Sequence, residues 1–343
     1  MQLNTDTFDF NAFLKAPDED YKLESPSRFR QQVVDRFYGE TRDAGATMPW
    51  PKTHKYIKFR PAEVTIWAGI NGHGRSMVTS HVALDLAWQG EVVCIMSMEM
   101  LPEATLGRMV RQASGRDTPS IRFIDRFLSW SDNRIVIFDH QGTVTAKLII
   151  GSIRYAAAKY GVTQFFVDSL MKCSKGEDDY NGQKDFVDEL TAAARDLRVH
   201  IHLVHHVKKL ENEFVIPGKF DAKGSGAITD QVDNYMVVWR NKKKEVILRA
   251  NPTDPKAMSD YDAVLKVDKQ RHGTGWEGQF GLFFDVGAQS YKEDMAMGVM
   301  RYEMPEEDVL PPLDTSPPTE GSWDSPVPIV AAQPAVTADP DAW

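Results

Sequence analysis

The chain has 343 residues, 42% of them hydrophobic and 10% aromatic, so it can form one large α/β domain or two small ones with a sizeable core. Its net charge of −9 lies in residues 303–343, which hold nine of the 49 acidic residues and no Lys or Arg; the other 40 acids balance 40 bases. Two cysteines and no secretory signal argue against a disulfide framework and favour the cytoplasm, and no apolar run reaches the roughly 20 residues of a membrane span.

Residues 1–50 are predicted to form an N-terminal arm that contains a helix. The segment "SRFRQQVVDRFYGETRDAG" (27–45) has an apolar residue at every fourth position and a glycine at its end, as an amphipathic helix requires. These apolar residues are Phe29, Val33 and Phe37. The helix could pack on its own domain or dock on a neighbouring subunit. Residues 47–63, with three prolines, are expected to be an extended lead-in.

From Val64 onward, short apolar runs alternate with longer helical stretches. The expected strands are 64–69, 92–99, 135–140, 164–170 and 199–206, and the expected helices are 75–88, 103–114, 119–129, 145–159 and 182–196. Nearly continuous apolar strands separated by helices predict an α/β fold with a mostly parallel sheet that is covered on both faces.

Four later runs are expected to join this sheet as antiparallel strands, because turns separate them: 234–240, 245–250, 263–271 and 278–285. "RNKKK" (240–244) is expected to be a hairpin turn that faces water.

Residues 301–343 are predicted to be a disordered tail. Nine of the 19 prolines of the chain lie in 303–343, and many charges with few apolar residues are typical of disorder. The tail ends in Trp343, an aromatic residue after several acids, which suits docking on a basic pocket of a partner protein. A solubilising tail without a partner is the alternative.

The segment "WAGINGHGRSM" (67–77) follows the pattern G-x-x-x-x-G-K-[S/T] of a phosphate-binding loop, except that Arg75 stands in place of the lysine. A strand leads into the loop and a helix leaves it, so the amide groups at the start of the helix can bind a polyphosphate. Ser76 is placed to bind Mg²⁺. A glycine-rich turn without a ligand is the alternative. The candidate nucleotide-binding residues are Gly69, Asn71, Gly72, Gly74, Arg75, Ser76 and Met77.

Arg75 keeps the charge of the usual lysine but not its shape. The guanidinium is planar and longer, and the two side chains are not interchangeable where a compact charge must reach the β- and γ-phosphates. A misplaced phosphate clamp lowers rates by roughly a hundredfold or more. We therefore expect the nucleotide to bind while hydrolysis falls steeply.

Two acids stand at the ends of strands near this loop. Asp168 in "FFVDSL" (165–170) is a candidate Mg²⁺ ligand, with a strand-capping acid as the alternative. Glu99 in "SMEM" (97–100) follows the next strand and is the candidate general base for a water that attacks the γ-phosphate; a surface glutamate is the alternative.

Two further strand ends carry bases. One of His205 and His206 in "HLVHHVKK" (202–209) could contact the γ-phosphate, or the pair could be core-edge histidines. Lys269 and Arg271 could remain solvated, or could reach the nucleotide of an adjacent subunit as an arginine finger.

A turn-rich segment, 207–224, follows the histidines and contains four lysines: Lys208, Lys209, Lys219 and Lys223. Lysines presented by a loop can follow the phosphates of single-stranded DNA without reading its sequence. A solvated surface loop is the alternative.

These motifs, in this order, resemble the RecA-type motor domain of the DnaB-family replicative helicases, most closely the branch of phage primase-helicases and the mitochondrial Twinkle helicase. The resemblance covers about residues 27–290. It rests on "GINGHGRS", "SMEM", "FFVDSL", "VHHVKK", "DAKGSGAITDQVDNYMVVWR" (221–240) and "KQRHGTG" (269–275). It implies a RecA-like P-loop NTPase motor over residues 51–300, in a hexameric ring that moves 5′→3′ on single-stranded DNA with ATP or dTTP and Mg²⁺.

The resemblance also implies roles for residues. His206 is similar to the γ-phosphate sensor of the family, Lys269 and Arg271 to its trans-acting pair, and residues 27–45 to the linker helix that closes the ring. The Gly224, Ser225 and Gly226 segment would line the DNA pore with the lysine loop. The acidic tail would contact a polymerase, a primase or a single-strand-binding protein, in a bacterium or a phage-infected cell.

Two departures from the family pattern limit these implications. Arg75 is expected to impair hydrolysis, and we expect the roughly 60 residues before the motor to be too few for a primase or for the large helical N-terminal domain of the family. A filament-forming DNA-repair ATPase of the RecA type, or a nucleotide-locked DNA clamp that does not hydrolyse, are the rival interpretations.

Overall fold

The computed structural model describes residues 24–38, 45–173, 179–208, 212–223 and 226–305, which fall into two units that divide before Gly45. In the first unit, η3 (Pro26–Phe29) leads into α2 (Arg30–Tyr38). The expected helix is therefore confirmed over these residues. Its apolar residues are about half exposed: Phe29 at 47%, Val33 at 51% and Phe37 at 59%. Of the predicted disordered tail (301–343), residues 301–305 are described, and Tyr302 and Met304 are buried there, with the Tyr302 amide donating to the Ala113 carbonyl oxygen at 2.9 Å. The rest of the tail, from residue 306, lies outside the described residues.

The described residues of the second unit form one sheet of nine strands in the order β3-β2-β4-β5-β1-β6-β7-β8-β9. The first six are parallel and the last three antiparallel, as the mostly parallel sheet predicted from sequence requires. The strands are β1 (Val64–Ala68), β2 (Val93–Ser97), β3 (Ile135–Ile137), β4 (Gln164–Asp168), β5 (His200–Val204), β6 (Asn234–Arg240), β7 (Ala263–Gln270), β8 (Gly278–Asp285) and β9 (Ser290–Lys292).

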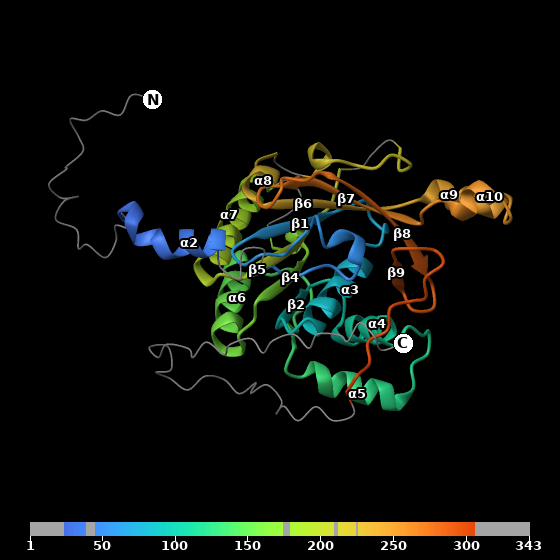
Figure 1. Ribbon diagram of the computed structural model, residues 1–343, viewed down its shortest axis with the longest axis horizontal. Helices are drawn as coiled ribbons and strands as arrows, with labels where there is room; N and C mark the ends of the chain where they lie inside the picture. Colours follow the sequence, from blue (N-terminus) through green and yellow to red (C-terminus); the bar gives the residue numbers. More distant parts are fainter. Residues whose placement is uncertain (1–23, 39–44, 174–178, 209–211, 224–225, 306–343) are drawn as a thin grey trace. The chain divides into compact units, whose positions relative to one another are not determined.

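Helices cover both faces of the sheet (Figure 1). Alternate residues of one strand enter different cores: Ile95 lies in one apolar cluster, and Cys94 and Met96 lie in the other. The first cluster includes side chains of α3 (Arg75–Trp88), α4 (Pro102–Ser114) and α5 (Ile121–Ser131), and the second those of α6 (Ala146–Tyr160), α7 (Tyr180–Leu197) and α8 (Gly226–Gln231). All the helices expected between residues 75 and 196 are present.

The strand expected at 245–250 is wrong, because these residues belong to α9 (Lys242–Ala250), which α10 (Pro255–Ser259) follows. The Asn241 side chain caps α9 by accepting a hydrogen bond from the Lys244 amide at 3.0 Å. Lys244 is 7% exposed and its Nζ lies 2.8 Å from Asp262 Oδ1. The expected water-facing turn at 240–244 is therefore also wrong, because a cap and the ion pair of the buried Lys244 stabilise a helix there.

The run at 234–240 is a strand, but the expectation that it is purely antiparallel is wrong. β6 pairs in parallel with β1, through Thr65 and Asn234 among others, and is antiparallel only to β7. It is thus the last of the parallel strands. The runs at 263–271 and 278–285 are antiparallel additions, as expected.

Candidate nucleotide-binding site

The glycine-rich loop joins β1 to α3 at the edge of the sheet where the parallel strands end. Gly72 and Gly74 have φ values of +76° and +86°, which glycine adopts without strain. A Cβ at Gly74 would lie 2.5 Å from Tyr291 Oη, and one at Gly69 would lie 2.5 Å from a β6 carbonyl oxygen. Neighbouring strands therefore leave room only for glycine at these two positions.

Arg75, the first residue of α3, is bound to the end of β5 and to its own loop. Its guanidinium donates to the His205 carbonyl oxygen, to Asn71 Oδ1 at 3.2 Å and to His206 Nδ1 at 2.9 Å. Burial lowers the pKa of Arg75, although the acids Asp168 and Glu99 oppose this shift. The planar group with several N–H donors serves three separate acceptors, which a single lysine ammonium could not do in the same geometry.

Ser76 and Asp168 meet as expected, and their oxygens are of the kind that binds Mg²⁺. The Ser76 hydroxyl donates to Asp168 Oδ2 at 3.1 Å. Burial raises the pKa of Asp168, and the negative charge of Glu99 raises it further. A cation between these oxygens and a polyphosphate would relieve both effects, so the residues fit a magnesium site that the nucleotide completes.

Glu99 is exposed and lies two residues beyond the end of β2. Ser169 Oγ donates a hydrogen bond of 3.1 Å to Glu99 Oε1, which orients the carboxylate. Glu99 and His206 line one cavity of about 920 Å³ together with Asn71 from the glycine-rich loop. The general-base candidate and the γ-phosphate candidate therefore share one space beside the loop.

The two histidines after β5 have different environments. His205 is fully buried, its Nε2 lies 2.6 Å from the Lys223 carbonyl oxygen, and burial lowers its pKa to about 4. His206 is half-buried, and its Nδ1 lies 2.5 Å from Asn71 Oδ1. His205 is thus a neutral structural residue, and only His206 faces the nucleotide loop.

Arg108 of α4 was not predicted from sequence. It donates to the Ser76 carbonyl oxygen at 3.1 Å, and its positive charge lies near Asp168. A lone arginine on a helix gives no sequence signal that separates it from a surface residue. The side chain of Met77 packs against the core and its carbonyl oxygen accepts from Gln112, so its predicted contact with a nucleotide would have to come from its backbone amide.

Residues 54–293 match the family model described as the DnaB-like helicase C-terminal domain, which is more than half of the chain. The chain belongs to this family. Two solved structures share its fold. One, an ATPase domain, aligns with a TM-score of 0.62 and 17% identity, over 78% of this chain and 99% of that chain. The other, a DnaB-like replicative helicase solved with its interactions with primase, aligns with a TM-score of 0.62 and 16% identity, over 78% and 68% of the two chains.

These matches confirm the predicted RecA-like fold and the resemblance to the DnaB family. Family membership implies an NTP-dependent helicase activity. Among the described residues, none of the helices of this DnaB-like domain is long and apolar enough to cross a membrane.

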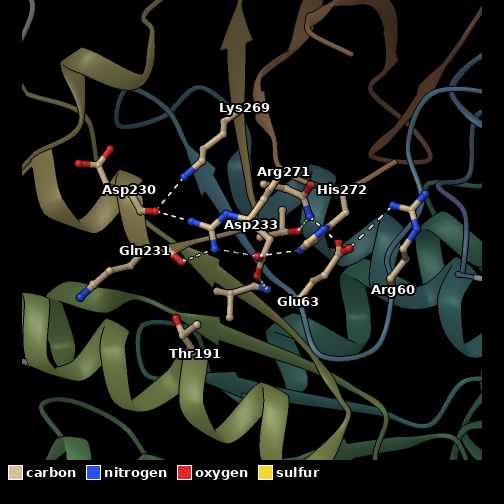
Figure 2. A network of polar contacts seen from close by, with 12 residues as sticks. Arg60, Glu63, Thr191, Asp230, Gln231, Asp233, Lys269, Arg271 and His272 are labelled. Carbon is tan, nitrogen blue, oxygen red and sulfur yellow. Dashed lines mark hydrogen bonds and ion pairs between the residues drawn. The ribbon is translucent and has the colours of Figure 1, made fainter. Parts of the chain in front are cut away.

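Lys269 and Arg271 lie at the opposite edge of the DnaB-like domain from the glycine-rich loop. Lys269 pairs with Tyr235 near the start of β6, and β6 starts beside the start of β1, whereas the loop follows the end of β1. Figure 2 shows both cations turned towards Asp230 of α8. One five-residue strand, about 16 Å long, separates the two edges, so neither cation joins the nucleotide site of its own chain.

Glu63 lies in the same network (Figure 2) and is 3% exposed. Asn234 Nδ2 donates to Glu63 Oε2 at 3.0 Å, Arg60 Nη1 lies 3.9 Å from Oε1, and burial raises the pKa of Glu63 to about 7. The folded chain therefore holds the Glu63 proton more tightly than the unfolded chain does. This difference contributes fully to the free energy of unfolding below about pH 4.5, the usual pKa of glutamate, and the contribution is lost as pH rises through about 7.

We therefore expect Glu63→Gln to remove a pH dependence of up to about 3 kcal/mol in the free energy of unfolding and to stabilise the domain at pH 8. Urea unfolding at pH 5 and pH 8 measures this. Glu189→Gln, a change of an exposed glutamate on α7, is the control and should have no effect. Equal pH dependence of the Glu63→Gln variant and the unaltered chain would contradict the prediction.

The predicted DNA-binding lysines are not all together. Lys208 and Lys223 line the 920 Å³ cavity beside the glycine-rich loop. The backbone amide of Lys219 donates to Asp268 of β7, and its Nζ lies 3.5 Å from Glu277, so this lysine lies near the Lys269 edge. Gly226 is the exposed first residue of α8. The remaining predicted contact residues, Lys209, Gly224, Ser225 and Trp343, lie outside the described residues.

Proposed function

We propose that this chain is the motor of a ring-forming replicative DNA helicase that couples NTP binding and hydrolysis to 5′→3′ movement on single-stranded DNA. The observation that carries this proposal is the arrangement of the sheet. One edge gathers the glycine-rich loop, Glu99, Asp168 and His206, and the opposite edge holds Lys269 and Arg271. Such a division supports a nucleotide site that is completed only by a second copy of the chain.

In this function each residue has a distinct task. The loop amides would bind the phosphates of ATP or dTTP, and Ser76 and Asp168 would hold Mg²⁺, which supplies positive charge to the transferred phosphoryl group. Glu99, oriented by Ser169, would accept the proton of the attacking water. His206 would contact the γ-phosphate, and Lys269 and Arg271 of a neighbour would stabilise the charge that develops during transfer.

One observation favours a second candidate, the nucleotide-locked clamp. The Arg75 guanidinium binds three acceptors of its own chain, including His206, and a nucleotide would have to compete for both side chains. In that case the ring would bind nucleotide and DNA without turnover. Nucleotide affinity, hydrolysis with and without single-stranded DNA, and unwinding of a forked duplex separate the two candidates. Electron micrographs with nucleotide and DNA would test the closed ring against a filament.

Three described lysines, Lys172, Lys208 and Lys223, line the cavity beside the glycine-rich loop. Lys208 and Lys223 belong to the lysine-rich segment 207–224, and we expect these two to contact DNA phosphates. The double change Lys208→Ala and Lys223→Ala should weaken binding to single strands of any sequence. It should also reduce the slope of log affinity against log salt by about 1.4, roughly 0.7 for each lost phosphate contact.

The matched control for this prediction is Lys219→Ala, because Lys219 lies near Asp268 and Glu277, close to the Lys269 edge and not in the cavity beside the loop. Fluorescence anisotropy with labelled oligonucleotides at several salt concentrations measures the affinity and its slope. If the Lys219 change alters the slope and the double change does not, DNA follows the other edge of the sheet.

The unit before Gly45 and the tail extend this proposal to partners. The exposed apolar residues of α2 would dock on a neighbouring subunit and close a hexamer. The acidic tail with Trp343 would bind a polymerase, a primase or a single-strand-binding protein in the cytoplasm of a bacterium or a phage-infected cell.

A further inference from the structure

The side chains of Lys269 and Arg271 share one set of acceptors at the end of α8. Lys269 Nζ donates to the carbonyl oxygens of Thr229 at 2.7 Å and Asp230 at 3.0 Å. Arg271 Nη2 donates to the same Asp230 oxygen at 2.6 Å. The carbonyl groups of the last turn of a helix carry partial negative charge and lack helical partners, so they attract cations. The two cations are therefore held as a pair, as Figure 2 shows.

Asp233 is the acidic side chain that pairs with Arg271 in this network. Its Oδ1 lies 3.2 Å from Arg271 Nη1 and 3.4 Å from His272 Nε2. Its Oδ2 accepts a hydrogen bond of 3.0 Å from the amide of Val64, the first residue of β1. Asp233 is 1% exposed, and a buried carboxylate is stable only when its oxygens are paired in this way.

Asp233 thus links Arg271 to the start of β1. The other end of β1 leads into the glycine-rich loop. The Arg271 side chain remains 36% exposed, so its guanidinium is held on one side and accessible on the other. A long side chain that is pre-oriented loses less conformational entropy when it binds a partner.

We propose that Asp233 is a positioning residue that holds Arg271, and through the shared Asp230 carbonyl also Lys269, ready for the nucleotide of a neighbouring subunit. This inference rests on the proposed trans-acting function of the two cations. Asp233 itself touches no nucleotide. Loss of the Asp233 carboxylate should therefore weaken the contribution of Arg271 and Lys269 to hydrolysis in the neighbouring subunit. Nucleotide binding by the loop of the same subunit should be unchanged.

Mixing of variant subunits tests this asymmetry. All the variants are made in the same parent chain, either the unaltered chain or the Arg75→Lys chain, whichever hydrolyses nucleotide faster. An Arg271→Ala chain keeps its nucleotide loop but gives no arginine, and an Asp168→Asn chain gives its arginine but lacks the metal ligand. Mixed together, they should recover hydrolysis at the seams where the two complement each other. Each is then mixed separately with an Asp233→Asn chain, which retains an acceptor for the Val64 amide.

In the mixture with the Asp168→Asn chain, we expect hydrolysis to be restored, because that chain supplies its own Arg271 to the intact nucleotide loop of the Asp233→Asn chain. In the mixture with the Arg271→Ala chain, we expect at least tenfold less hydrolysis, because the only arginine comes from the Asp233→Asn chain. Asp233→Glu, which keeps the charge, should recover part of this loss and gives the same asymmetry test if the Asn variant does not fold. Asp262→Asn is the matched control, because Asp262 also accepts from a backbone amide of a strand, that of Phe284 in β8, and pairs with a cation, Lys244 of α9. It should serve normally in both mixtures.

Two results would overturn the positioning role. In the first, the Asp233→Asn chain supports as much hydrolysis as the Asp262→Asn control in both mixtures. In the second, the Asp233→Asn and Asp233→Glu chains both fail to support hydrolysis, equally in the two mixtures. Full hydrolysis by the Arg271→Ala chain alone would instead refute the trans-acting function on which the inference rests.

Discussion

Replacing Arg75 with lysine is expected to raise the kcat for ATP or dTTP hydrolysis by about a hundredfold or more, with a much smaller change in nucleotide affinity. In the present chain, the guanidinium is bound to the His205 carbonyl oxygen and to the side chains of Asn71 and His206. Lysine would place one compact charge at the β- and γ-phosphates and would release His206 for the γ-phosphate. The loop amides that we propose as the nucleotide ligands are the same in both chains.

Steady-state hydrolysis with single-stranded DNA, together with equilibrium binding of a fluorescent nucleotide, measures the two effects separately. Arg75→Ala is the necessary comparison, because it also releases His206 but removes the charge. We expect it to remain inactive. Equal hydrolysis by the unaltered and Arg75→Lys chains would show that arginine serves as well as lysine at this position, and equal gains from Lys and Ala would place the whole effect on His206.

Removing the guanidinium of Arg271 is expected to lower kcat by about a thousandfold or more, because arginine fingers in phosphoryl transfer contribute roughly 10³ to 10⁵. Arg271 lies across the sheet from the loop of its own chain, so Arg271→Ala should leave the nucleotide Kd nearly unchanged. The defect should be repaired by subunits that carry an intact Arg271 and an Asp168→Asn change.

Hydrolysis is measured in the faster of the unaltered and Arg75→Lys chains, and electron micrographs establish that the ring still forms. Arg271→Lys is the matched variant, since it keeps the charge without the planar group, and we expect an intermediate rate. A loss of nucleotide binding in Arg271→Ala, or no recovery on mixing, would mean that Arg271 acts within its own subunit or only in folding.

The sequence was informative wherever the determining interactions are local. Apolar runs of about five residues between helical stretches predict the parallel strands, because side-chain periodicity reflects burial on the faces of a sheet. The glycine-rich loop was also found from sequence, since its positive φ values and its position before a helix follow from residue type and order. The same approach was wrong at 245–250, where apolar β-branched residues suit a strand but a cap and the Lys244–Asp262 ion pair stabilise a helix.

The sequence by itself determined the α/β class, the loop, the strand-end acids and the identity of the arginine at position 75. Only the tertiary structure decided that His205 is buried against the Lys223 carbonyl oxygen, that Arg108 reaches Ser76, and that Lys269 and Arg271 lie at the far edge of the sheet. The physical reason is that strand order and burial arise from pairings between residues far apart in the chain, such as Thr65 with Asn234, which local residue patterns do not specify.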